Sequence, residues 1–298
     1  MLKILRKQLL EFVRRLLGTE GLFQQLQQQQ KTLLALGNGM TYSFSNHERM
    51  KSSAQYKRCA ELIALLSPMD IKGAKYVRVG QDCDGGYVML DDFQRKVDAA
   101  YSFGISHNVS WDEAMAGREI DVFMYDHTIK RLAKQHPRFH YAKKGITGFD
   151  KLVNCKTLGE LIAENAHVAS KNLILKMDIE GCEWDVFKQA APGILSQFSQ
   201  IVVELHGLTV FDGVKHKMIV EVLGKIHETH QSVHVHANSG ITPFWIGDLV
   251  LPEVLEVTYV RRDDFRDRFI KNTRQFPTEL DQPSFKTWPE IYLGSFSV

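Results

Sequence analysis

Carboxylates and a histidine follow two apolar stretches that are typical of buried strands. Asp178 and Glu180 come directly after residues 173–177, and Glu204 and His206 end the next such stretch. The carboxyl ends of parallel strands meet at one edge of a sheet, so we expect these side chains to converge. Their oxygen and nitrogen atoms suit a divalent cation such as Mg²⁺ or Mn²⁺, which would lower the pKa of a bound sugar hydroxyl. We therefore predict a metal site formed by Asp178, Glu204 and His206.

Two other interpretations of these residues stay open. Without a metal, His206 would act as the general base that removes the proton of a hydroxyl, and Asp178 and Glu180 would complete the catalytic group. Alternatively, Asp178 and Glu180 cap the helix that follows, and His206 bonds only the backbone. Cys182 lies beside them without a base partner in the sequence, so we do not assign it as a nucleophile.

A second group of residues ends two earlier strand-like stretches. Gly104 lies in a tight turn where a ligand can approach the backbone, and Asp126 stands where a carboxylate accepts both hydroxyls of an adenosine ribose. The alternative role of Asp126 is to cap a helix that begins at Thr128. The turn lacks the GxGxxG pattern, so a cofactor without phosphates fits better than a dinucleotide. The predicted cofactor contacts are Ser102, Phe103, Gly104, Asp126, His127, Asp84 and Gly85.

Two further segments are candidates for ligand contact. His236 and Asn238 come at the end of another strand-like stretch, and we predict that they contact the substrate or a metal; the alternative is that they are satisfied core residues. Residues 84–87, with two glycines, form either a hairpin turn or a lid over the cofactor.

The elements that would position these residues alternate between strand-like and helix-like patterns after residue 58. The expected strands are 99–103, 120–125, 140–144, 173–177, 201–205, 232–237 and 255–260, and the expected helices are 110–117, 128–135, 156–165, 183–196 and 213–229. Such alternation indicates βαβ units and therefore an α/β fold, with a mostly parallel sheet covered on both faces.

The N-terminal segment has a different pattern. Steps of three and four from Leu2 to Leu33 meet apolar residues at eight of ten positions, which is typical of a coiled coil and of a homo-oligomer. Residues 1–18 also carry five basic residues and one acid, so a basic helix on an anionic membrane surface, or a helix packed on its own domain, are the alternatives. We predict a helical extension over residues 1–36, a linker over 37–57 and one α/β domain over 58–298.

Composition limits the class of protein. The chain has 298 residues, of which 44% are apolar, and a formal net charge of +2, which does not favour a nucleic-acid partner. The four cysteines are scattered without metal-binding spacing, which is typical of reduced thiols in the cytoplasm. No apolar run reaches the 18 residues of a membrane span.

Several segments, taken in order, carry a resemblance to a known family. They are Arg78–Val88, Tyr101–Ser106, Lys176–Trp184, Val203–His206, His236–Asn238, Glu256–Tyr259 and Phe276–Pro283. They resemble the FkbM-type S-adenosylmethionine-dependent O-methyltransferases over residues 75–293. The resemblance implies a Rossmann-like class I methyltransferase fold, with a seven-stranded, mostly parallel sheet that has one antiparallel strand. It also implies transfer of a methyl group to a hydroxyl, commonly of a sugar.

Three function classes follow from these observations. The first is a cytoplasmic O-methyltransferase that uses S-adenosyl-L-methionine and acts on a glycan or glycosylated carrier. Residues 1–36 would join it to the inner face of the membrane or to a glycan-assembly enzyme. The second is an NAD-dependent sugar oxidoreductase on a similar sheet, which the turn at Gly104 disfavours. The third is a non-catalytic scaffold assembled by the N-terminal helix.

Overall fold

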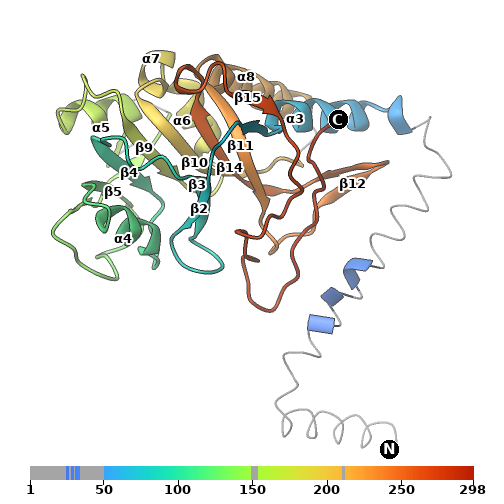
Figure 1. The fold of residues 1–298 in the computed structure, drawn as a ribbon, viewed down its shortest axis with the longest axis horizontal. Helices are drawn as coiled ribbons and strands as arrows, with labels where there is room; N and C mark the ends of the chain where they lie inside the picture. Colours follow the sequence, from blue (N-terminus) through green and yellow to red (C-terminus); the bar gives the residue numbers. More distant parts are fainter. Residues whose placement is uncertain (1–24, 27, 30, 34–49, 149–153, 210–211) are drawn as a thin grey trace, which may run out of the picture.

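The computed structural model describes residues 25–26, 28–29, 31–33, 50–148, 154–209 and 212–298. Within these residues one large sheet has the strand order β11–β14–β10–β9–β4–β5–β6 (Figure 1). Its strands are β4 (Ala99–Phe103), β5 (Val122–Tyr125), β6 (Phe139–Ala142), β9 (Leu173–Met177), β10 (Phe198–His206), β11 (His230–Ala237) and β14 (Val254–Arg261). Only β14 runs antiparallel to its neighbours in this sheet, β10 and β11. The predicted α/β sheet with one antiparallel strand is therefore confirmed.

Two apolar clusters cover the two faces of the sheet. One contains side chains of four helices and of the short helix Pro192–Leu195, and the other contains side chains of α4 and of the hairpin formed by β2 and β3. Figure 1 shows α3 and α8 together above the sheet, with α4 and β2 on the other side of the molecule. The helices are α3 (Ala54–Leu66), α5 (Leu158–Glu164), α6 (Glu183–Gln189) and α8 (Gly213–Thr229) on the first face, and α4 (Ser110–Ala116) on the second, with β2 (Tyr76–Val79) and β3 (Tyr87–Leu90).

Small two-stranded sheets and short helices complete the fold. β1 (Met69–Ile71) pairs with β15 (Phe269–Lys271), β7 (Gly145–Ile146) with β8 (Cys155–Lys156), and β12 (Phe244–Ile246) with β13 (Leu249–Leu251). The short helices are α7 (Pro192–Leu195) and η1 (Arg262–Asp264). The segment 80–86 joins β2 to β3, so it is a hairpin loop, as one of its two interpretations predicted.

Two predicted helices differ from the structure. The helix expected over 128–135 is wrong, because these residues form bends: the Asp126 carboxylate accepts the N–H groups of Thr128 and Ile129, and Tyr141 donates to the Ile129 carbonyl. The Asp126 bonds are those of a helix cap, but the Tyr141 hydroxyl uses the Ile129 carbonyl, which a helix would pair with one of its own N–H groups. The helix expected over 183–196 is divided into α6 and α7, because Pro192 cannot continue a helix and instead begins the second one.

The N-terminal prediction lies mostly outside the described residues. The residues described there, 25–26, 28–29 and 31–33, are helical. Helix α3 begins at Ala54, within the stretch predicted as a linker, where Ser53 caps its first turn by accepting from the N–H of Tyr56. Among the described residues, no helix is both long enough and apolar enough to cross a membrane.

The strand order creates the crevice where the site lies. From β4 the chain continues through β5 to β6 on one side, and it then crosses to β9 on the other side of β4. Ligands of open α/β sheets bind outside the carboxyl ends of the strands at such a reversal. The ends of β4 and β9 carry Gly104 and Asp178.

Candidate active site

The carboxyl ends of β4 and β9 approach each other closely at Gly104. This glycine has φ +74°, and a Cβ atom there would lie 1.5 Å from the carbonyl oxygen of Asp178. The N–H of Asp178 donates to the Phe103 carbonyl at 3.2 Å, and the Lys176 ammonium donates to the Gly104 carbonyl at 2.7 Å. Only glycine fits this backbone conformation and this space, so the turn at Gly104 fixes the position of the Asp178 backbone.

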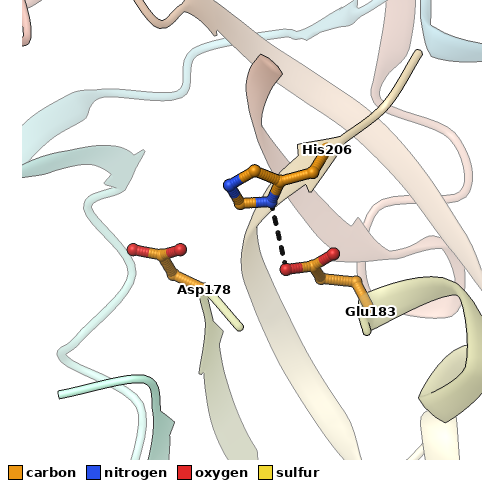
Figure 2. Close-up of side chains that lie close together, drawn as sticks. All are labelled: Asp178, Glu183 and His206. Carbon is orange, nitrogen blue, oxygen red and sulfur yellow. Dashed lines mark hydrogen bonds and ion pairs between the residues drawn. The ribbon is translucent and has the colours of Figure 1, made fainter. Parts of the chain in front are cut away.

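Asp178, Glu183 and His206 form the central group of the site (Figure 2). Nδ1 of His206 lies 3.2 Å from Oε1 of Glu183, which also accepts the backbone N–H groups of Ile179 at 2.9 Å and Gly181 at 3.2 Å. In Figure 2 the other side of the ring and the Asp178 carboxylate face the same space. The Trp184 indole donates to the His206 carbonyl at 2.7 Å. The imidazole is thus held at Nδ1 by Glu183, while Nε2 faces Asp178 and the exposed side chain of Glu180.

The charges around His206 control its protonation. Burial alone would lower its pKa, but the hydrogen bond and the charge of Glu183 raise it, and the charges of Glu204 and Asp178 add to this. The result is a pKa of about 9. A histidine beside a carboxylate of this kind is typical of proton-transfer sites.

Glu180, predicted as catalytic, lies at the rim of this group. Its Oε2 is 3.5 Å from Nε2 of His206, and its side chain is 89% exposed. It has φ +57°, and Gly181 follows with φ +102°, so the chain turns sharply here and brings Glu183 back towards the loop. Glu183, and not Asp178 or Glu180, accepts the N–H groups of this turn.

The predicted metal site is assembled only in part. Ligand atoms of Asp178, Glu183 and His206 lie within 4.8 Å of one another, but Glu204 is not in this group. Glu204 is buried, and its Oε1 instead accepts from the Asn238 amide at 2.7 Å. Oε1 of Glu183 already accepts three N–H groups, and its Oε2 points away from Asp178 in Figure 2. This donor set suits proton transfer better than it suits a divalent cation, and we derive no step through a metal ion.

A line of charged side chains extends from Glu204 across the sheet. The strand registers pair Glu204 with Glu256, and Glu256 with His236. Nδ1 of His236 lies 3.0 Å from Glu256, and Nε2 lies 3.0 Å from Glu290 of the C-terminal segment. Burial opposes protonation of His236, but the two carboxylates raise its pKa well above the usual value. Both nitrogens are therefore occupied by the protein, and the predicted substrate contact at His236 stays a prediction.

Glu204 lies at one end of this line. Burial raises its pKa well above the usual value, and the neighbouring charges of Asp178 and Glu256 raise it further. Asn238, the other predicted substrate contact, bonds both Glu204 and, through its Oδ1, the N–H of Gly240 at 2.8 Å.

Asp126 has a structural role that the sequence predicted only in part. Its Oδ2 accepts the N–H groups of Ile105 and Ser106, each at 2.9 Å, and its Oδ1 accepts from Thr128. Burial opposes ionisation, yet these hydrogen bonds lower the pKa of Asp126. The carboxylate therefore joins the turn after β4 to the turn after β5. Contact with a ribose stays a prediction.

The other predicted cofactor residues lie at different depths. Ser102 and Phe103 are fully buried, and the Phe103 ring stacks on Tyr125 with centroids 5.3 Å apart, so their side chains belong to the core. His127 is exposed at the end of β5. Asp84 and Gly85 lie in the hairpin loop, where the Asn108 amide donates to the Asp84 carbonyl at 3.0 Å. Burial raises the pKa of Asp84, as does the charge of Asp178, so this loop lies close to the site.

Sequence reasoning missed three residues of the site. Glu183 is the third acid of the segment Lys176–Trp184, and its position three residues after Glu180 was a usable signal. Lys176 is buried and faces Tyr87, with its ammonium 5.9 Å from the ring centroid. A lysine inside an apolar strand was the signal for it. Glu290 carried no signal, because it comes from an irregular C-terminal segment.

Comparison with known proteins gives a match to a family model. A search of curated proteins found no match to this sequence. Residues 92–232 match the family model described as the methyltransferase FkbM domain. This range includes β4, β5, β9 and β10, and with them Gly104, Asp178, Glu183 and His206. This segment of the chain is therefore similar to the methyltransferase FkbM domain.

Proposed function

We propose that this protein is an O-methyltransferase that transfers the methyl group of S-adenosyl-L-methionine to a hydroxyl of a sugar. The observation that carries the proposal is the His206 imidazole, oriented by Glu183 and open towards Asp178, at the carboxyl ends of the strands beside Gly104. A hydroxyl is a weak nucleophile until its proton is removed, and a positioned histidine can accept that proton.

The surroundings of Gly104 support S-adenosylmethionine over a dinucleotide. A pyrophosphate needs free backbone N–H groups in the turn after the first strand. The amides of Ile105 and Ser106 both donate to Asp126 instead. The charge of Asp178 raises the pKa of both Asp84 and Glu204, and an acidic environment of this kind favours a positive sulfonium and opposes the negative charge of a pyrophosphate.

Different residues of the chain have different roles in the reaction. When bound, S-adenosylmethionine supplies an activated methyl group: the acceptor oxygen forms a bond to this carbon while the carbon–sulfur bond breaks. Nε2 of His206 accepts the hydroxyl proton, and Glu183 stabilises the imidazolium that results. Asp178 orients the hydroxyl towards His206. Orientation should contribute much of the rate, because the displacement requires the acceptor oxygen in line with the methyl group.

Calorimetric titration with S-adenosylhomocysteine tests the proposal. We expect binding in the micromolar range, and no binding of NADH by fluorescence in the same preparation. Chelation of divalent cations should leave both binding and methyl transfer unchanged, because Oε1 of Glu183 is already occupied by the N–H groups of Ile179, Gly181 and His206. Well-folded, metal-replete protein that binds no S-adenosylhomocysteine would contradict the proposal, and loss of transfer on chelation would restore a cation to the site.

A further inference from the structure

A cavity of about 720 Å³ lies beside the end of the charged line, and the methyl-transfer chemistry does not use it. It is formed by the segment around β12 and β13 and by the C-terminal segment, with Gln28, Lys31 and Thr32 on one side. Figure 1 shows β12 and the red C-terminal segment in this part of the molecule. Its volume is that of a pocket for a small organic ligand.

The walls of this pocket combine aromatic rings with carboxylates. Trp245, Trp288 and Tyr292 contribute rings, and Asp248 and Glu290 contribute acids. Trp288 is 38% exposed and Tyr292 is 64% exposed, so their rings are open to a ligand. The electron-rich face of an aromatic ring attracts the polarised C–H groups of a sugar, while carboxylate oxygens accept its hydroxyls. This combination fits an uncharged, polyhydroxylated ring.

Glu290 connects the pocket to the catalytic edge. Its Oε2 is bonded to His236, which lies in register with Glu256 and thus in line with Glu204 on β10. Its Oε1 is buried and has no hydrogen-bond partner among the residues that the structure describes. A buried carboxylate oxygen without a partner costs free energy, which a hydroxyl of a ligand would recover by donating to it.

The pocket and His206 lie over different strands of the sheet. Neighbouring strands lie about 4.8 Å apart, so the two steps from β10, which carries His206, through β14 to β11, whose His236 contacts Glu290, span roughly 10 Å. One sugar ring is shorter than this span. A ligand that reaches both places must therefore contain at least two linked rings.

We propose that this pocket binds a second sugar unit of an oligosaccharide acceptor whose methylated unit lies at His206, an inference that rests on the function proposed above. The acceptor is then an oligosaccharide or a longer glycan, and a free monosaccharide is a poor substrate. Trp245 and Trp288 determine the affinity for the acceptor and leave the cofactor site unaffected.

The test is binding of the full chain to a printed array of defined glycans, from monosaccharides to long oligosaccharides. We expect the wild type to bind a class of oligosaccharides and not the corresponding monosaccharides. Trp245→Ala and Trp288→Ala should each weaken this binding by about tenfold or more. Trp245→Phe, which keeps a ring, and Ile270→Ala, an exposed residue outside the pocket, serve as matched controls that should bind as the wild type does.

Binding of S-adenosylhomocysteine by the same preparations separates the two proposals. If the wild type binds S-adenosylhomocysteine but no glycan, or if both tryptophan variants bind glycans as the wild type does, the pocket does not hold a sugar and this inference is wrong. If S-adenosylhomocysteine itself does not bind, the proposed function fails. Retained binding of S-adenosylhomocysteine by the variants shows that they are folded.

Discussion

His206 combines two properties that work against each other in a general base. Glu183 makes the imidazolium more stable, which helps it to accept a proton, but the same carboxylate keeps the ring protonated near neutral pH because the pKa is about 9. The neutral ring is the form that can accept a proton. We therefore expect the reaction to be limited at pH 7 by the small fraction of neutral His206.

The pH dependence of methyl transfer follows from this. Because the base must be neutral, kcat/KM should rise by about tenfold per pH unit below the pKa and level off near pH 9. Glu183→Gln should move this midpoint to lower pH by roughly one to three units, since it removes the partner charge. Initial rates of transfer from labelled S-adenosylmethionine, measured across the pH range, test both. A flat profile for the wild type would remove His206 from the role of base.

The raised pKa of His206 affects the stability of the fold in the opposite direction. The pKa of His206 is about 9 in the folded protein and about 6.5 in an unfolded chain, so its contribution is present in full below about pH 6.5 and is lost as pH rises through about 9. Activity should therefore increase over the interval in which this contribution to stability disappears.

Asp178 gives a second prediction at the scale of single residues. Asp178→Asn keeps the volume of the side chain but removes the charge that orients the hydroxyl opposite His206. We expect kcat to fall by about 10²-fold or more, with the fold retained. Transfer assays together with the melting temperature test this, and Asp185→Asn, on α6 beside the site, is the control for charge alone. A fully active, folded Asp178→Asn would contradict the assignment.

Part of the site could be predicted from the sequence, and the reason is topological. Asp178 and His206 follow neighbouring parallel strands, so their convergence depends only on strand order. Glu183 lies in the group with Asp178 and His206, where Glu204 was predicted, because the directions of both side chains depend on local geometry. The turn with positive φ at Glu180 and Gly181 returns the chain so that Glu183 faces His206. Glu204 instead accepts a hydrogen bond from the Asn238 amide. Neither interaction is visible in spacing.

At the scale of elements, the central strands were the most predictable. The bounds of β4 and β9 agree with the prediction at both ends, because each is a short, largely apolar run between polar or glycine-rich segments. Helix α8 also agrees, because Asp212 caps it by accepting the N–H groups of Val214 and Lys215. Strands β10 and β11 are longer than predicted, because Gln200 and His230 lie in strand positions despite their polarity. Pairing with β14 overrides their low preference for strands.

The junction between β4 and β9 gives a prediction at this scale. Gly104→Ala would place its Cβ 1.5 Å from the carbonyl of Asp178, and backbone atoms of two sheet strands cannot easily move apart. The left-handed conformation alone costs about 1–2 kcal/mol for a residue with a Cβ. We expect lower stability, measured by denaturant unfolding, and weaker binding of S-adenosylhomocysteine.

A second glycine provides the matched control. Gly224 lies inside α8, and a Cβ there meets no atom within 4 Å. Gly224→Ala should increase the free energy of unfolding by up to about 1 kcal/mol, because alanine favours the helix, and it should leave binding unchanged. Equal stability of Gly104→Ala and the wild type would mean that the fold does not need the close approach of β4 and β9 at Gly104.

At the scale of the whole molecule, charge and apolar surface are unevenly distributed. Residues 1–18 contain five basic residues and one acid, whereas the chain as a whole carries +2. Leu26 and Leu33 belong to the predicted heptad seam, and they are 53% and 66% exposed in the single chain. Apolar seam positions of a helix that remain exposed are typical of a surface that pairs with another helix.

We therefore expect the chain to form homo-oligomers through this seam. Light scattering coupled to size-exclusion chromatography should give a mass that is a multiple of 34.1 kDa for the wild type. The double variant Leu26→Asp and Leu33→Asp should reduce it to that of one chain, because charges in a seam position oppose pairing. Replacing Val168 and Val214, which are more exposed than the two leucines but lie elsewhere, should leave the mass unchanged. If the double variant keeps the wild-type mass, the seam does not determine the assembly. If the wild type itself has the mass of one chain, this segment is free to bind a different partner or an anionic membrane. Binding to vesicles with and without anionic lipid then distinguishes the membrane from another partner.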